Sequence, residues 1–232
     1  MCGFLGFVGE NTSNIQKNFE NAFETINHRG PDSSEIYRSE KYLLGFKRLA
    51  IIDLDGRSNQ PYTDGENFLL FNGEIYNYKD LKKNLITDFG CRFDTAGDAE
   101  VLFNGLKYKG EKFLREIDGM FALCFISNNG DILLARDKFG QKPLFYYIDK
   151  NKNLVFGSEL GSIIKFLGKD SLEINEDGFL YYFQYGASIA PDTFFKGLMQ
   201  VVPGEFVRLN SQLANATKEN WSATPLKECA KI

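Results

Sequence analysis

The amino-acid sequence predicts an α+β domain in which helices cover antiparallel sheets. The predicted elements run in groups, β, α, ββ, β, αα, ββ, ββ, αα, β, whereas a parallel sheet needs strands and helices in strict alternation. The chain has 232 residues, 43% of them hydrophobic, and its 22 Phe and 11 Tyr are enough for a large core. This length suits one compact domain, or one domain with a tail.

The first part of the chain supplies a strand, a helix and two further strands. Residues 3–8 form a short apolar run, which is typical of a buried strand. Residues 11–13 offer a helix cap, and apolar residues then recur at helical spacing at Ile15, Phe19, Phe23 and Ile26. Residues 36–37 and 42–52 are predicted strands, and the polar segment 53–65 is a predicted loop.

The middle of the chain predicts one strand followed by helices. Residues 68–71 are apolar, and Asn72-Gly73-Glu74 then suggests that the strand ends at a turn. Asn77 is a candidate cap for a helix that carries Leu81, Leu85 and Phe89. A second helix is predicted after Asp98, and a short one over 113–117.

The last part of the chain predicts two hairpins, two helices and a strand. The first hairpin joins 120–127 to 132–136 through an Asn-Gly turn, and the second joins 144–148 to 154–157. The helices are expected over 160–167 and 179–185, and the strand over 205–209. Residues 211–232 are polar and weakly periodic, so we expect a tail there.

Composition excludes several classes of function. The net charge is −4 without a basic patch, which argues against nucleic acid as a partner. The four cysteines have no CxxC spacing, which fits neither a disulfide framework nor a zinc site and suits a reducing compartment, so we expect a cytoplasmic protein. A single histidine, His28, excludes a His-rich metal site, and no apolar stretch is long enough to span a bilayer.

Cys2 is the candidate nucleophile. If Met1 is removed, Cys2 carries a thiol beside a free α-amine, and an amine that is neutral near pH 7 can take the thiol proton. Such an arrangement places nucleophile and base in one residue. The alternative is an inert, buried thiol, which is the more common situation for an isolated cysteine.

Several motifs together resemble the glutamine-hydrolysing domain of class II, N-terminal nucleophile, glutamine amidotransferases, in particular the N-terminal half of glutamine-hydrolysing asparagine synthetases. Each motif is short, and it is their order and spacing that make the resemblance specific. They are Met1-Cys2-Gly3, His28-Arg29-Gly30-Pro31-Asp32, Arg48-Leu49-Ala50-Ile51-Ile52-Asp53, Asn72-Gly73-Glu74-Ile75-Tyr76-Asn77, Asp98-Ala99-Glu100-Val101, Arg136-Asp137, Gly140-Gln141-Lys142-Pro143-Leu144, Phe156-Gly157-Ser158-Glu159 and Pro203-Gly204.

The resemblance implies a fold and a nucleophile. The fold is a four-layer αββα sandwich of two antiparallel sheets, the N-terminal nucleophile hydrolase fold. Cys2 would form a γ-glutamyl thioester with glutamine, with its own α-amine as base. The Asn72 side chain and the Gly73 backbone would form the oxyanion hole, although an Asn-Gly pair is also common in ordinary hairpin turns.

The resemblance also assigns residues to the recognition of free glutamine. Arg48 would bind the α-carboxylate, and Asp98 and Glu74 the α-ammonium, with backbone groups of Leu49 and Ile51 beside them. From sequence alone, Asp98 could also cap a helix, a role compatible with binding. Arg48 could be a charge at a strand edge, but its apolar neighbours argue against this.

His28 and Arg29 belong to a loop that the resemblance places over the substrate. We expect them to order this loop near the nucleophile. Because His28 is the one imidazole in the chain, it is also an alternative general base to the α-amine.

The resemblance further implies a synthetase that consumes the ammonia. We expect a glutaminase domain over 1–210, and over 211–232 a tail or the start of a linker to a missing synthetase domain. No SGG pyrophosphate loop occurs in the sequence, so ATP and magnesium are expected on that domain or partner, and no cofactor or metal on this chain. Aspartate is the expected acceptor.

Several alternatives stay open at this point. The acceptor of the ammonia could be a different carboxylate, such as a sugar acid. The chain could also be a non-catalytic binding or assembly module that retains the fold, or a hydrolase of another amide. A homodimer is a further possibility, and neither nucleic acid nor membrane is an expected partner.

Overall fold

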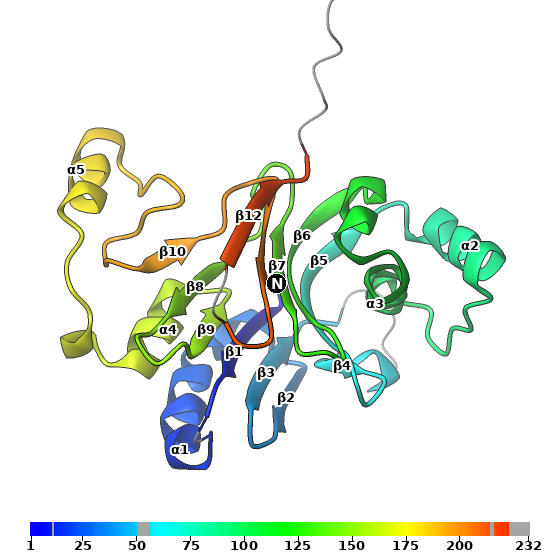
Figure 1. The fold of residues 1–232 in the computed structure, drawn as a ribbon, viewed down its shortest axis with the longest axis horizontal. Helices are drawn as coiled ribbons and strands as arrows, with labels where there is room; N and C mark the ends of the chain where they lie inside the picture. The colour runs from blue at the N-terminus through cyan, green and yellow to red at the C-terminus, as the bar shows by residue number, and fades with distance from the viewer. Residues whose placement is uncertain (11, 51–55, 214–215, 223–232) are drawn as a thin grey trace, which may run out of the picture.

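The computed structural model describes residues 1–10, 12–50, 56–213 and 216–222 and places two six-stranded sheets face to face. The strand order is β10-β8-β9-β1-β3-β2 in the first sheet and β12-β11-β7-β6-β5-β4 in the second. All neighbouring strands are antiparallel. Figure 1 shows the two sheets between helices on either side.

The twelve strands have these bounds in the described part of the chain. In the first sheet they are β1 (Gly3–Val8), β2 (Ser33–Arg38), β3 (Tyr42–Arg48), β8 (Phe145–Ile148), β9 (Leu154–Gly157) and β10 (Leu198–Gln200). In the second sheet they are β4 (Tyr62–Thr63), β5 (Phe68–Ile75), β6 (Gly119–Ile126), β7 (Ile132–Arg136), β11 (Glu205–Leu209) and β12 (Ala216–Asn220).

Helices form the two outer layers. The α-helices are α1 (Thr12–Phe23), α2 (Tyr78–Phe89), α3 (Asp98–Lys109), α4 (Leu160–Leu167) and α5 (Glu176–Tyr185). Short 3₁₀ helices cover Glu24–Arg29, Gly56–Ser58, Gly110–Glu116 and Lys169–Ser171. None of the helices in the described ranges combines the length and the apolar character needed to cross a lipid bilayer.

Three groups of buried apolar side chains separate the four layers. The first lies between β1 and α1 and includes Leu5 and the ring of Phe19. The second lies between the sheets and includes Phe4 and Leu70. The third lies between the second sheet and α2 and α3 and includes Phe121. This layering is the predicted αββα sandwich, and it follows from strands that are buried on both faces.

The structure differs from the sequence prediction at the end of β5. We predicted a turn at Asn72-Gly73, but β5 runs on to Ile75 and pairs with β6, with Asn72 opposite Ala122 and Gly73 opposite Phe121. A Cβ on Gly73 would lie 2.2 Å from the Met120 carbonyl oxygen, so glycine permits this close approach of the two strands. Strand pairing therefore outweighs the local turn preference.

The chain after residue 211 also differs from the expected tail. Residues Ala216–Asn220 form β12, which pairs with β11 at the edge of the second sheet. Trp221 is then buried, and its indole N–H donates to the Arg136 carbonyl at 3.1 Å. All five residues of β12 are exposed and polar or small, so the strand carries no apolar alternation that a sequence pattern could reveal.

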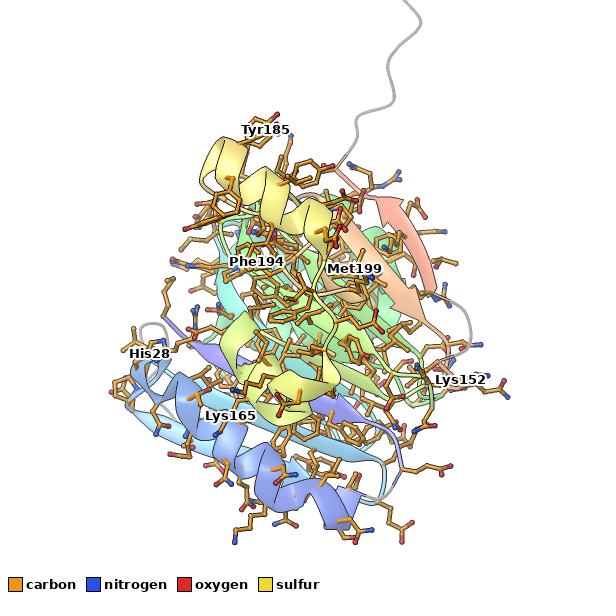
Figure 2. All side chains as sticks on the ribbon, turned by 90° about the vertical axis from the view of Figure 1, so that its left-hand side faces the viewer. His28, Lys152, Lys165, Tyr185, Phe194 and Met199 are labelled. Atoms are coloured by element: carbon orange, nitrogen blue, oxygen red, sulfur yellow. The ribbon has the colours of Figure 1, made fainter. Side chains whose placement is uncertain are left out.

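The helices of the two outer layers are buried to different extents. Helix α3 buries eight of its twelve residues, whereas Gly178 is the one buried residue of α5. Figure 2 shows α5 at the top of the view, on the side of the first sheet, with Tyr185 pointing outward. Helix α5 is therefore the least buried of the five α-helices in the described part of the chain.

Candidate active site

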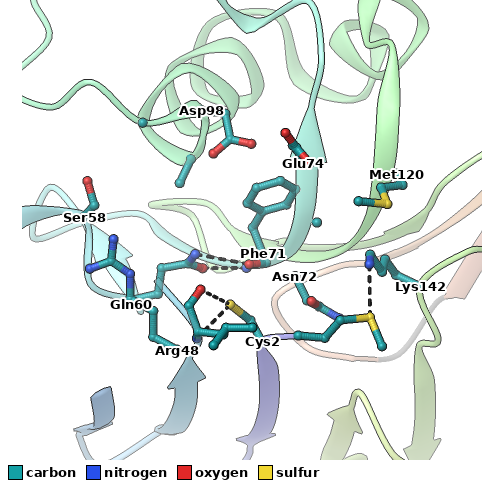
Figure 3. A pocket seen from close by; sticks show the side chains of 15 residues that line it. Cys2, Arg48, Ser58, Gln60, Phe71, Asn72, Glu74, Asp98, Met120 and Lys142 are labelled. Atoms are coloured by element: carbon teal, nitrogen blue, oxygen red, sulfur yellow. Dashed lines mark hydrogen bonds between the residues drawn. The ribbon is translucent and has the colours of Figure 1, made fainter. Parts of the chain in front are cut away.

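A pocket opens where β1 begins, where β3 ends, and along the edge of β5 that β4 leaves uncovered. Strand β4 pairs only with Phe68 and Leu69, so the rest of β5 has a free edge on that side. Seven residues with predicted roles line this pocket: Cys2, Arg48, Leu49, Asn72, Gly73, Glu74 and Asp98. They come from four separate segments of the chain, which the fold brings together (Figure 3).

The sulfur of Cys2 is held by the backbone at the end of β3. The Leu49 N–H donates to Sγ at 3.3 Å, and the thiol lies 3.5 Å from the Leu49 carbonyl oxygen. This contact is possible because Gly3 pairs with Lys47, which aligns the start of β1 with the last residues of β3. The predicted nucleophile thus sits in a fixed place on the pocket wall.

The Arg29 side chain contacts the N-terminal residues. Its Nε donates to the Cys2 carbonyl at 2.9 Å, and its Nη1 lies 3.0 Å from Glu159 Oε1. A Cβ on Gly3 would lie 2.6 Å from Arg29 Cδ, so the glycine leaves room for this side chain. Arg29 is therefore close to the nucleophile, as the sequence led us to expect.

His28 lies apart from Cys2. Its Nε2 is 2.8 Å from Glu159 Oε1, and its side chain is 62% exposed and does not line the pocket. Figure 2 shows it at the surface. The alternative of His28 as the general base has no support in this geometry.

The free edge of β5 points backbone groups into the pocket. On this side the Gln60 amide bonds both the N–H and the C=O of Phe71, and the Asp98 carboxylate accepts from the Ile75 N–H at 2.9 Å. Backbone groups two residues apart on a strand point to the same side. The Gly73 N–H, midway between these two, therefore points into the pocket between Gln60 and Asp98.

The Asn72 side chain faces the nucleophile. Leu70 and Asn72 share one face of β5, and Leu70 packs between the sheets in the same group of residues that Cys2 contacts. Asn72 is 2% exposed, and its amide Nδ2 has no hydrogen-bond partner among the described residues. A buried donor without a partner is uncommon and calls for an explanation, such as a ligand atom that it binds.

Charged side chains lie on both sides of Cys2 in the pocket. Figure 3 shows Arg48, Ser58 and Asp98 on one side of Cys2, and Lys142 and Met120 on the other. Arg48 is buried, and its Nη1 donates to Asn59 Oδ1 at 2.7 Å.

Asp98 is the first residue of α3, and its carboxylate accepts from the Ile75 N–H of β5 and from backbone N–H groups at the start of the helix. The N-cap residue of α3 is Gly97, so Asp98 is not the cap. Burial raises the pKa of Asp98, and the Glu74 carboxylate adds to this, while hydrogen bonds from backbone N–H groups such as that of Ile75 act in the opposite direction. An ammonium bound between the two carboxylates would relieve their repulsion.

Two further results concern the predicted residues. Ile51 lies outside the residues that the structure describes. Among the described residues no three His, Cys, Asp or Glu side chains group together in a way that could hold a metal ion.

Several residues of the pocket wall were not predicted from the sequence. Gln60 and Lys142 are the clearest, since both are buried and polar. Lys142 lies within the motif Gly140-Gln141-Lys142-Pro143-Leu144, which was a signal that could have directed attention to it.

The matching family and the similar proteins point to the same kind of domain. The glutamine amidotransferase domain family matches residues 1–221 of the chain. Asparagine synthetase [glutamine-hydrolyzing] 1 of Bacillus subtilis is 34% identical over 211 residues, which cover 88% of this chain and 33% of the relative. A putative asparagine synthetase [glutamine-hydrolyzing] 2 of Methanocaldococcus jannaschii is 33% identical, covering 87% of this chain and 42% of the relative.

Among solved structures, glutamine phosphoribosylpyrophosphate amidotransferase from B. subtilis superposes with a TM-score of 0.67 at 19% identity. The match covers 96% of this chain and 50% of that one, and it supports the fold. The chain thus spans about a third to two fifths of the length of the two curated relatives. The family match over nearly the whole chain and the agreement in fold lead to one conclusion: the chain belongs to the glutamine amidotransferase domain family.

Proposed function

We propose that this chain hydrolyses the side-chain amide of glutamine to glutamate and ammonia through a thioester on Cys2. The observation that carries the proposal is the placement of the Cys2 sulfur, the unpartnered Asn72 amide and the charged pair Arg48 and Asp98 around one pocket. Family membership and relatives named as glutamine-hydrolysing synthetases support it further.

Glutamine binds by its two α-substituents at the charged side of the pocket. The Arg48 guanidinium pairs with the α-carboxylate, while Asp98 and Glu74 accept hydrogen bonds from the α-ammonium. The backbone of Leu49, which lines the pocket, lies beside them, and a contact from Ile51 stays a prediction outside the described residues. The side-chain amide of glutamine then extends toward Cys2 and Asn72.

The reaction proceeds in two steps. With Met1 removed, the α-amine of Cys2 takes the thiol proton, and the thiolate attacks the carboxamide carbon. The oxyanion that forms is stabilised by the Asn72 side chain and the Gly73 N–H. The C–N bond breaks, and ammonia leaves with the proton from the amine; water then attacks the thioester, and glutamate and the free thiol are released.

The ammonia is consumed by an ATP-dependent synthetase domain or subunit that amidates aspartate. The printed names of the curated relatives, glutamine-hydrolysing asparagine synthetases, support an asparagine-forming partner. We assign ATP and magnesium to that partner as part of the proposal. The fraction of the relatives' length that this chain spans supports a division of labour between two domains. A cytoplasmic location fits the free thiols of Cys2, Cys91 and Cys124, and a homodimer remains a prediction.

The proposal is tested by measuring glutamate release from glutamine. The protein is prepared with Cys2 as its first residue, which mass spectrometry verifies, and is compared with a Cys2→Ala variant and with a form that retains Met1. We expect turnover from the first form and only background hydrolysis from the other two. Equal rates for all three would refute a Cys2 mechanism, and no turnover by a folded, Met1-free protein would support a non-catalytic module.

A further inference from the structure

Lys142 places a buried positive charge next to the N-terminus. It is 7% exposed and lines the pocket with Cys2, Asn72 and Met120, on the side of Cys2 away from Arg48 (Figure 3). Its Nζ donates to the Met1 sulfur at 3.1 Å. No carboxylate among the described residues lies within salt-bridge distance of Nζ, and a thioether is a weak acceptor.

The backbone of Lys142 is fixed on both sides of the peptide. Its N–H donates to Asp137 Oδ2 at 3.0 Å, and its carbonyl accepts from Arg136 Nε at 2.7 Å. Asp137 is fully buried, and Arg136 is buried beside it. The backbone that carries the ammonium is thus hydrogen-bonded to two buried side chains, and the lysine side chain itself is buried.

Removal of Met1, which the proposed function requires, changes what this ammonium faces. The Met1 sulfur is a few bonds from the Cys2 nitrogen, so it lies within roughly 6 Å of that atom. Once Met1 is gone, Nζ loses its sulfur acceptor. It then lies across the vacated space from the new α-amine.

Other charged groups also surround this amine. The cations are Arg29, which pairs with Glu159, and Arg48, which bonds Asn59. The anions are Glu74 and Asp98 on the far side of the pocket, and Glu159, which also contacts His28. When glutamine is bound as proposed, its α-carboxylate pairs with Arg48 and its α-ammonium with Asp98 and Glu74, which leaves one negative charge on that side of the pocket. Lys142 lies on the other side of Cys2 and, among the described residues, has no carboxylate within salt-bridge distance; the buried Asp137 accepts only from its backbone N–H.

We propose that the Lys142 ammonium keeps the α-amine of the mature Cys2 neutral near pH 7. A nearby like charge disfavours the protonated form of an amine. The amine must be neutral to take the thiol proton. Lys142 is therefore a positioning residue that acts through electrostatics on the base, without touching the substrate's reacting atoms.

The test measures the proton affinity of the amine directly. Protein labelled with ¹⁵N-cysteine, which contains only four labelled sites, is prepared with Cys2 first by cleaving an N-terminal extension, and the amine nitrogen is titrated by NMR without glutamine. Lys142→Met removes the charge at similar length, Lys142→Gln does so with a polar group, and Lys142→Arg retains it. Thermal unfolding establishes that each variant is folded.

We expect the amine pKa to rise by about one unit in the Met and Gln variants and to stay within a few tenths in the Arg variant. The acid limb of the kcat/KM profile for glutamine should move by the same amount. An amine that titrates at the same pH in all four proteins overturns the inference. Because the titration needs no turnover, a shifted amine in a protein that releases no glutamate would refute the proposed function and leave this inference intact.

Discussion

The two sides of the pocket differ in how far the protein satisfies its own polar groups. On the recognition side, Arg48 is bonded to Asn59 and Asp98 to the Ile75 N–H. On the nucleophile side, the Asn72 amide has no partner among the described residues, and the Lys142 ammonium has only the Met1 sulfur. The charged groups of the recognition side thus have hydrogen bonds before the substrate arrives, whereas on the nucleophile side the Asn72 amide is a donor for an atom that the substrate supplies.

This difference predicts different kinetic consequences on the two sides. A group that binds the ground state and the transition state alike changes KM, and a group that binds only the transition state changes kcat. Substitutions near Cys2 should therefore lower kcat, and those near Arg48 and Asp98 should raise KM. Four substitutions test this contrast, in order of decreasing effect.

Asn72→Ala should have the largest effect. Removing one oxyanion-hole donor typically lowers kcat by about 10²–10³-fold, and KM should change little because the ground-state amide gains less from this donor. Steady-state kinetics with glutamine measure both. Asn104→Ala is the matched control, since that side chain donates to the Glu100 carbonyl on α3, away from the pocket. A rise in KM at constant kcat would contradict the assignment.

Arg48→Lys should come next and act on binding. Lysine retains the charge but loses the planar fork, so we expect kcat/KM to fall roughly 10–100-fold, mainly through KM. Because Arg48 also bonds Asn59, thermal unfolding should be compared with that of the unsubstituted protein. Arg38→Lys, at an exposed pair with Glu20, is the control and should leave kinetics unchanged. A loss confined to kcat would instead place Arg48 on the nucleophile side.

Asp98→Asn should raise KM by about tenfold, because a neutral amide binds an ammonium more weakly than a carboxylate does. The same residue predicts a pH dependence. Burial and then the Glu74 charge raise the pKa of Asp98 despite the opposing backbone hydrogen bonds, so glutamine binding should weaken as the pH falls through that raised value. KM measured against pH in the unsubstituted protein and in Asp98→Asn checks this, since only the former should show the dependence.

The stability of the folded protein should change with pH in the direction opposite to glutamine binding. Between the ordinary aspartate pKa, about 4, and its raised value in the fold, the folded state holds a proton that the unfolded chain has released. Stability of the free protein should therefore decrease as the pH rises through this window. Asp98→Asn lacks this slope, and melting curves over the window in both proteins measure it. Parallel pH dependences would show that Asp98 is not the titrating group.

The sequence alone predicted the parts of the fold that rest on apolar runs and the parts of the site that rest on motifs. Strand β1 follows its apolar run from Gly3 to Val8, and the motif residues Cys2, Arg48, Asn72 and Asp98 do meet at one pocket. The meeting itself could not be predicted from local patterns, because it depends on sheet order and on a strand edge left open by the short β4.

The errors have physical causes of the same kind. Asn72-Gly73 has the local preference of a turn, but pairing with β6 extends the strand through it. Strand β12 is exposed and polar and lies at the edge of the sheet. Its pairing with β11, and no pattern in its own sequence, makes it a strand. Lys142 was missed as a site residue because a lysine in a loop is usually solvated, and only the fold reveals that this one is buried.

His28→Ala should have the smallest effect, and it decides between the two candidate bases. The ring is exposed and bonds Glu159, and Arg29 retains its own contact with Glu159 and with the Cys2 carbonyl when the ring is removed. An exposed pair of this kind contributes about 0–1 kcal/mol, so kcat and KM should each change less than about fivefold. The acid limb of the pH profile is the sharper measurement, because it would vanish if His28 were the base. An unchanged acid limb in His28→Ala, together with a shifted one in Lys142→Met, would locate the base at the N-terminal amine.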